Sequence, residues 1–124
     1  ALNLKTIAMA TPYTSGIARK EKNFLEAVIP GLKIVSEKNL ETVSNLERGN
    51  LFPFSAYLTA KEANTPEADG VFISCTNWRT IEIIGPLEHD LGKPIVTSNQ
   101  ASLWFALKKM GMAGDPKYGR LFNF

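Results

Sequence analysis

The sequence predicts an α/β fold in which a four-stranded parallel sheet carries helices on both faces. The main observation is that apolar stretches suited to buried strands alternate with amphipathic stretches, and the order strand then helix occurs four times. Crossover connections between parallel strands are right-handed, so helices are expected on both faces. The composition agrees with one globular domain, because a chain of 124 residues with 44% hydrophobic and 21% charged residues can bury a sizeable core.

The first half of the chain begins with residues 4–10, which are mostly apolar and predict a buried strand. A turn cluster at residues 11–16 opens a helix, because apolar side chains recur at helical spacing over residues 17–28. A proline and a glycine end that helix, and a second strand is predicted at residues 32–36.

The middle of the chain contains a long polar stretch, residues 37–50. Structureless loops of that length are uncommon in compact domains, so this stretch indicates a functional role. Pro53 then begins a new helix, which ends before residues 66–69. The apolar run that follows, residues 70–73, predicts the third strand.

The last part of the chain repeats the pattern. Residues 78–91 predict a helix with a kink at Pro86, residues 95–97 predict the fourth strand, and a final helix is expected to stop near Gly111. Residues 113–124 are poorly periodic and are predicted to be a tail that packs on a missing or partner domain. Residues 1–112 then form the α/β domain.

Cys75 is the only cysteine and stands where the third strand gives way to the polar residues 74–77. A helix beginning at this point would favour a thiolate, because its unpaired N–H groups and positive dipole end stabilise an anion. The alternative is that Cys75 is a small buried hydrophobic residue, which is the commoner role of a lone cysteine. Cys75 is the first candidate for chemistry.

Charge and hydropathy argue against several kinds of partner. Fourteen basic and twelve acidic residues give a net charge of +2, and the scattered basic residues do not predict nucleic-acid binding. No apolar stretch approaches the roughly 20 residues that cross a bilayer, so no membrane partner is expected. A single cysteine forms no internal disulfide, and a cytoplasmic location is expected.

The spacing of reactive residues argues against several chemistries. A thioredoxin-type exchange needs a second cysteine, and a papain-like pair needs a histidine base. His89 is the only histidine and is interpreted as a surface residue, and Arg79 follows Cys75 too closely for a phosphatase loop. Nucleotide-binding glycine motifs and metal-ligand clusters are absent from the sequence. Chemistry without a cofactor or metal is therefore predicted.

Hydroxyl and amide side chains gather at the predicted strand ends. They could bind the oxygens of a carboxylate substrate without a metal, although Ser, Thr and Asn are also the favoured helix N-caps. Tyr13 follows Pro12 at the tip of the first strand, where its hydroxyl is either a donor into a cleft or part of the core. The hydroxyl and amide residues at these ends are Thr11, Thr14, Ser74, Thr76, Asn77, Ser98 and Asn99.

Several strings in the chain resemble the C-terminal half of maleate cis-trans isomerases and of their relatives, the arylmalonate decarboxylases and the aspartate/glutamate racemase superfamily. The most specific string is ISCTNWRT at residues 73–80. The others are ATPYT at 10–14, SNLE at 44–47, GKPIVTSNQ at 92–100 and YGRLF at 118–122. Together they span the chain.

The resemblance implies a flavodoxin-like domain that is one half of a two-domain racemase-type fold, with the active site between the halves and one cysteine usually offered by each. In the isomerases the cysteine of the other half is expected to add to maleate, while the one matching Cys75 handles a proton. In the decarboxylases the cysteine matching Cys75 instead protonates an enediolate, which forms by loss of carbon dioxide. Tyr13 and Asn45 match positions that bind substrate carboxylates, and the Cys-Thr-Asn string is nearer to the isomerases.

The chain departs from the family pattern because it covers only about half of its length, and a lone Cys75 cannot run a two-cysteine mechanism. We therefore expect half of a cofactor-independent isomerase for a small dicarboxylate, completed by a missing N-terminal domain or by self-association. The alternatives are a decarboxylase or racemase, or an inactive binding module. The predicted site residues are catalytic Cys75 and substrate-binding Thr11, Tyr13, Asn45, Thr76, Asn77 and Ser98.

Overall fold

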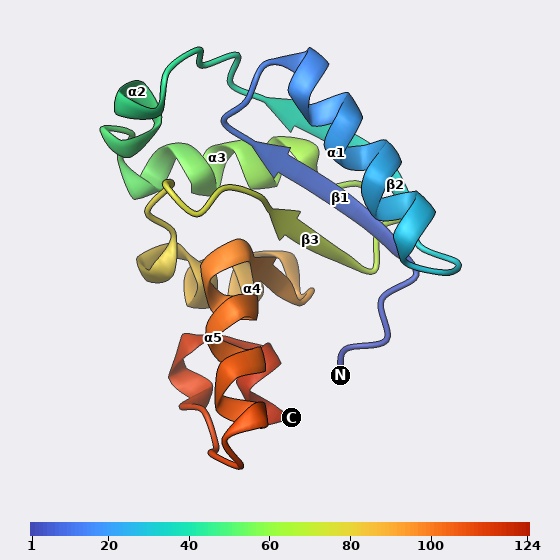
Figure 1. Cartoon of the computed structure of the whole chain (residues 1–124), viewed down its shortest axis with the longest axis vertical. Coiled ribbons are helices and arrows are strands. Elements are labelled where there is room, and N and C mark those ends of the chain that lie inside the picture. The colour runs from blue at the N-terminus through green and yellow to red at the C-terminus, as the bar shows by residue number, and fades with distance from the viewer.

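The protein, described over residues 1–124 by a computed structural model, contains one parallel sheet of four strands in the order β2-β1-β3-β4 (Figure 1). All three strand pairings are parallel. The strands are β1 (Thr6–Thr11), β2 (Lys33–Asn39), β3 (Gly70–Ile73) and β4 (Ile95–Thr97). The predicted α/β fold is therefore confirmed.

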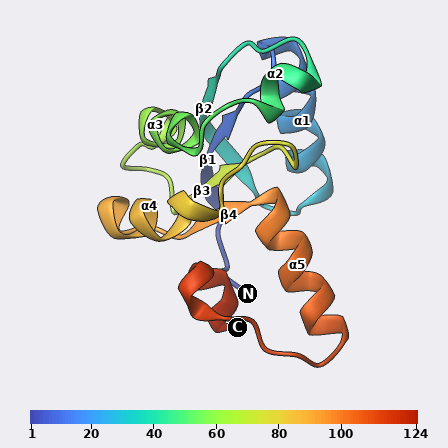
Figure 2. The ribbon, with the colours of Figure 1, turned by 90° about the vertical axis from the view of Figure 1, so that its left-hand side faces the viewer.

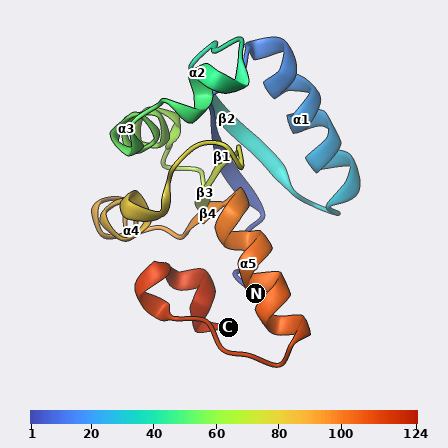
Figure 3. The ribbon, with the colours of Figure 1, turned by 60° about the vertical axis from the view of Figure 1, so that its left-hand side comes forward.

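Helices lie on both faces of the sheet, as Figures 2 and 3 show. α1 covers one face, while α3 and α4 cover the other. None of the helices is both long enough and apolar enough to span a membrane. The helices are α1 (Ser15–Val28), α2 (Asn45–Gly49), α3 (Pro53–Ala63), α4 (Ile84–Leu91) and α5 (Ser98–Lys109), with 3₁₀ turns η1 (Ile81–Ile83), η2 (Pro116–Tyr118) and η3 (Arg120–Asn123).

The two faces of β1 build two cores, because successive side chains of a strand point to opposite faces. Ala8 and Ala10 belong to the larger cluster, which contains 14 buried residues and includes Ala56, Ala60 and Ala63 of α3. Small side chains on both elements let α3 approach the sheet closely. Ile7 and Met9 belong to a second cluster of five buried residues on the α1 face.

The strand order places a topological switch between β1 and β3. The connection after β1 leads to the edge strand β2, whereas β3 continues the sheet in the opposite direction. Parallel α/β sheets bind ligands in the crevice outside the carboxyl ends of the strands at such a point. The segments after β1 and β3, which carry Tyr13 and Cys75, therefore meet at the edge where a site is expected.

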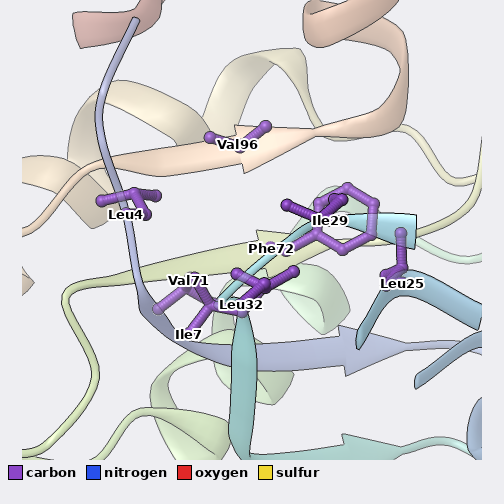
Figure 4. A pocket seen from close by; sticks show the side chains of 8 residues that line it. All are labelled: Leu4, Ile7, Leu25, Ile29, Leu32, Val71, Phe72 and Val96. Atoms are coloured by element: carbon purple, nitrogen blue, oxygen red, sulfur yellow. The ribbon is translucent and has the colours of Figure 1, made fainter. Parts of the chain in front are cut away.

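An apolar groove opens on the α1 face of the sheet. It encloses a cavity of about 270 Å³ lined by eight hydrophobic residues from the start of the chain, α1 and the segment after it, β1, β3 and β4 (Figure 4). α5 does not cover it, because this helix runs from β4 away from the sheet (Figures 2 and 3). The side chains of Leu103 and Phe105 on α5 are consequently 52% and 58% exposed.

The polar stretch at residues 37–50 is more ordered than the sequence predicts. β2 continues to Asn39 at the edge of the sheet, where polar side chains can face solvent. α2 begins after Ser44, whose hydroxyl accepts a 3.1 Å hydrogen bond from the Glu47 N–H and so caps the helix. The remaining loop is short.

The helix predicted from residue 78 begins later than expected. Only the turn η1 precedes α4, and Pro86 lies in the first turn of α4. Proline is tolerated there because the first turn has no partner for its missing N–H, so no kink results.

The segment 113–124, which the sequence predicts to be a tail, packs on this chain's own α4 and α5. The Glu88 carboxylate accepts hydrogen bonds from the N–H groups of Arg120 and Ile95, and Gln100 Nε2 donates to the Tyr118 carbonyl at 2.7 Å. Leu121 is 5% exposed. The buried Glu88 supplies an intramolecular anchor that hydrophobic periodicity does not reveal.

Candidate active site

The candidate site lies where β1 and β3 end. The Ser74 N–H donates a 2.9 Å hydrogen bond to the Ala10 carbonyl, which continues the pairing of β3 with β1 by one residue. The chain then turns at Cys75, which is 7% exposed. The thiol therefore lies just beyond the end of β3, a central strand of the sheet.

Cys75 has an unusual backbone conformation, with a φ of +133°. A side chain is strained in this region, which glycine adopts freely, and such strain concentrates at functional sites. Two hydrogen bonds hold the turn: the Cys75 N–H donates to Ser98 Oγ at 3.2 Å, and the Trp78 N–H donates to the Cys75 carbonyl at 3.4 Å.

The predicted helix N-terminus at Cys75 is wrong, because the first helical residue after it is Ile81 of η1. The argument that a helix dipole stabilises a thiolate therefore does not apply here. The residues between Cys75 and Ile81 form a loop that is held by side-chain hydrogen bonds. The spacing of apolar residues in the sequence did not distinguish this loop from the helix that follows it.

Tyr13 faces Cys75 across the switch point. Burial raises the pKa of the Tyr13 phenol to about 12, and the neighbouring Cys75 and the charge of Glu21 act in the same direction. Tyr13 therefore stays protonated and can donate a hydrogen bond at any physiological pH. Its ring also lies 5.0 Å from the guanidinium carbon of Arg48.

Arg48 is a member of the site that the sequence analysis missed. It is 8% exposed, its Nη1 donates to Asn45 Oδ1 at 3.0 Å, and its Nε donates to Thr42 Oγ1 at 3.1 Å. None of the four ion pairs in the structure includes it. A buried cation without an anionic partner is costly and marks a place for an anion. The sequence signal that could have identified Arg48 as a site residue is its position one helical turn after Asn45.

Glu21 is the second residue that the sequence analysis missed. The Ser74 hydroxyl donates a hydrogen bond to Glu21 Oε1, whereas the buried Oε2 has no hydrogen-bond partner. Burial raises the pKa of the Glu21 carboxyl, and the bond from Ser74 opposes this rise. A carboxylate within an otherwise basic helix segment reads as a surface residue, so the sequence carried no signal of its burial.

The predicted amide and hydroxyl residues lie on loops around Cys75. Asn77 Nδ2 donates to the Asn45 carbonyl at 2.6 Å, which joins the loop after β3 to α2. Asn99 Nδ2 donates to the Thr76 carbonyl at 3.0 Å, which joins the same loop to α5. The side chains of Asn45, Thr76 and Asn77 are exposed, and Ser98 is half-buried.

Thr11 is a correction to the predicted set. It is fully buried, its hydroxyl donates to Asn39 Oδ1 at 2.7 Å, and the same oxygen accepts from the Tyr13 N–H at 3.2 Å. Both roles of the hydroxyl are therefore taken by the protein. Thr11 thus shapes the turn that carries Tyr13.

Neither cavity of the structure contains Cys75. One is the apolar groove, and the other lies between α5, η1 and the C-terminal turns. The groups around Cys75 lie instead on the segments that follow the strand ends. His89 is remote from them, with a side chain that is 88% exposed. Nowhere do three or more His, Cys, Asp or Glu side chains gather as a metal site.

These features define a flavodoxin-like α/β domain with a single strained cysteine at its switch point, flanked by a phenol, a carboxylate and a guanidinium. The chain belongs to the arylmalonate decarboxylase family, because the family model described as Arylmalonate decarboxylase matches residues 1–122.

Three relatives show how far the likeness extends. An arylmalonate decarboxylase of Bordetella bronchiseptica is 30% identical over 99% of this chain and 52% of its own length. A maleate isomerase of Nocardia farcinica is 27% identical over 99% of this chain and 49% of its own length. A solved structure of the Nocardia farcinica maleate cis-trans isomerase superposes with a TM-score of 0.91 at 24% identity, over 98% of this chain and 49% of that one. That structure is of a cysteine-to-serine mutant with a covalently bound succinylcysteine intermediate.

The chain spans about half the length of these relatives. Its fold corresponds to one α/β half of theirs.

Proposed function

We propose that this chain supplies one half of a cofactor-independent, cysteine-dependent active site for a small dicarboxylate, with isomerisation of the maleate-to-fumarate type as its reaction. The observation that carries the proposal is the placement of Cys75 and Tyr13 together at the switch point of the sheet. The maleate isomerase relative, 27% identical along nearly all of this chain, supports the reaction type.

The substrate carboxylates are assigned to the neutral donors around Cys75. The Tyr13 hydroxyl stays protonated because burial raises its pKa to about 12. Asn45, Thr76, Asn77 and Ser98 offer amide, hydroxyl and backbone donors on the surrounding loops. Arg48 adds a positive charge behind Tyr13 and Asn45. Hydrogen bonds and a nearby cation are the usual way in which proteins hold carboxylates without a metal.

In the proposed reaction a cysteine thiolate of the second half adds to one alkene carbon, forming a carbon–sulfur bond. The electron pair of the double bond moves to the other carbon, which takes the proton of the Cys75 thiol. After rotation about the new single bond, Cys75 removes the proton and the carbon–sulfur bond breaks, which releases fumarate. The covalent succinylcysteine in the Nocardia structure is consistent with such an intermediate.

The second half is needed because this chain contains one cysteine. The apolar groove and the exposed apolar side chains of α5 are surfaces that a soluble protein normally covers. We assign them to contact with a second α/β half, either the domain that the longer relatives contain or another copy of this chain. A monomer without that half is expected to bind carboxylates and not to turn them over.

Decarboxylation of an arylmalonate is the second candidate, favoured by the family model and by the 30% identical relative. Loss of carbon dioxide would leave an enediolate, to whose carbon the Cys75 thiol would give its proton, and the thiolate would regain a proton from water. This reaction needs one cysteine.

A substrate panel tests the proposal. The chain is incubated with maleate, phenylmalonate or L-aspartate, both alone and after co-expression with the half of the Nocardia farcinica maleate isomerase that it does not match. The products are followed by NMR, with Cys75→Ser as the control. Fumarate that disappears with Cys75→Ser supports the proposal. Phenylacetate or D-aspartate would replace it by decarboxylation or racemisation. If no substrate is turned over but maleate protects Cys75 against alkylation, the chain is a binding module. If there is neither turnover nor protection, both the isomerase and the binding module are overturned.

A further inference from the structure

Glu21 has no role in the reaction proposed above, yet its carboxylate is inserted into the Cys75 site. It comes from α1, and its Oε1 accepts the hydrogen bond of Ser74, the residue immediately before Cys75. The second oxygen, Oε2, is buried and has no partner. An unpartnered buried oxygen is rare in native structures and is expensive when it carries charge.

The surroundings of Glu21 contain no group that neutralises it. No ion pair in the structure includes Glu21. The charge of Glu21 is felt by the Tyr13 phenol, which also contacts Cys75, so the carboxylate and the thiol share one neighbour. Arg48 lies over the Tyr13 ring, and it donates hydrogen bonds to Thr42, Val43 and Asn45 rather than to Glu21.

An anionic ligand beside Cys75 would meet this carboxylate at short range. Two negative charges in close proximity repel each other in water, and they repel several times more strongly where solvent is excluded. Burial already raises the pKa of Glu21, and a neighbouring anion would raise it further by favouring the neutral form. The protonated form removes the repulsion and makes Oε2 a hydroxyl.

We propose that Glu21 is a specificity-determining residue of the Cys75 site: an anionic ligand enters beside Cys75 when Glu21 carries a proton and is repelled when Glu21 is ionised. The inference rests on the proposed function in taking a carboxylate as the ligand of this site. It adds that occupation of the site takes up a proton, so that carboxylate ligands are favoured as the pH falls through the titration of Glu21.

The other groups that face this cluster keep their charge as the pH falls from neutral, so Glu21, whose pKa burial raises, supplies the change of charge. The pKa of Tyr13 is about 12, and Arg48 keeps its charge throughout. On the β2–α2 loop, hydrogen bonds from Ser15 lower the pKa of Glu41, so that carboxylate is already ionised. His89 is exposed and lies on α4, away from this edge.

Two alkylating agents of the same chemistry measure the charge beside the thiol. Iodoacetate is anionic and iodoacetamide is neutral, and both react with the thiolate, so the ratio of their rate constants cancels the fraction of thiolate. For the wild type, the ratio of iodoacetate to iodoacetamide should rise about threefold or more as the pH is lowered from about 8 to about 5. Glu21→Gln should have a high ratio at all pH values, while Glu26→Gln on the same helix should keep the wild-type profile.

A wild-type ratio that does not change with pH, or a ratio that Glu21→Gln leaves unaltered, would overturn the inference. The wild-type profile decides the matter even if Glu21→Gln is poorly folded, and Glu21→Asp, which keeps the charge, should retain the pH dependence. Because neither agent requires turnover or a second half of the fold, the result is separate from the fate of the proposed isomerase activity.

Discussion

The Cys75 N–H donates a 3.2 Å hydrogen bond to the hydroxyl of Ser98, so the second residue after β3 is held by the first residue after β4. This bond joins the loop after β3 to the first residue of α5, and it anchors a residue whose φ is +133°. Ser98 is thereby part of the framework that sets the position of the thiol as well as a candidate donor to the substrate.

Replacing Ser98 by alanine should destabilise the fold by about 1 kcal/mol, the usual contribution of one such hydrogen bond. Urea unfolding followed by fluorescence measures the change. Ser102→Ala is the matched control, because the Ser102 hydroxyl is exposed and bonds only the Ser98 carbonyl of its own helix. If both variants lose the same stability, the Cys75 anchor has no special value.

The Cys75→Gly variant should be more stable than the Cys75→Ala variant, although glycine usually lowers the stability of a protein. At a positive φ the alanine side chain is strained, and glycine is not, so Cys75→Gly is expected to exceed Cys75→Ala by about 1 kcal/mol in unfolding free energy.

The neighbouring exposed Thr76, which lacks a positive φ, supplies the comparison. There Thr76→Gly should be less stable than Thr76→Ala. The same order of stability at both positions would contradict strain at Cys75.

Glu21 should make the wild type less stable as the pH rises. Its pKa in the folded protein is raised above the ordinary value, so the folded state holds a proton that the unfolded state has lost over the interval between the two values. Measured by urea unfolding at about pH 4 and about pH 7, Glu21→Gln should therefore gain stability relative to the wild type at the higher pH.

Asp69 supplies a control of opposite sign. The N–H groups of Thr6 and Lys5 donate to its carboxylate and lower its pKa. Its contribution is present above the ordinary aspartate value and is lost as the pH falls through the lowered one. Asp69→Asn should therefore lose more stability relative to the wild type at about pH 7 than at about pH 2. If Glu21→Gln followed the same trend with pH, the assignment of Glu21 would be refuted.

The apolar groove should make the purified chain self-associate, because another copy is then the only second half available. Sedimentation velocity at increasing protein concentration is expected to show a dimer, and Ile29→Lys should shift it to monomer by placing a charge in the groove. Leu58→Lys is closely matched, since Leu58 is 44% exposed and Ile29 is 43% exposed, but it lies on α3 at the opposite face of the sheet. A chain that is monomeric throughout, or equal effects of the two lysines, would show that the groove is not the contact.

Local patterns located the strands and the cysteine correctly. Apolar runs of suitable length predicted β1, β3 and β4 near their observed positions, because buried strands need little beyond continuous hydrophobicity. The same reasoning failed for the loop after Cys75, whose apolar Trp78 packs into the core from irregular backbone and imitates a helical pattern. It also missed α2, which depends on a side-chain cap.

By itself, the sequence determined the alternation of strands and helices, the position of the only thiol after the third strand, and the family to which the chain belongs. Only the tertiary structure decided which side chains surround that thiol. The order β2-β1-β3-β4 brings Tyr13 beside Cys75, and the packing of α1 inserts Glu21 under Ser74. Strand and helix formation depend on residues close together in sequence, whereas these neighbours are up to 62 positions apart and meet only when the sheet assembles.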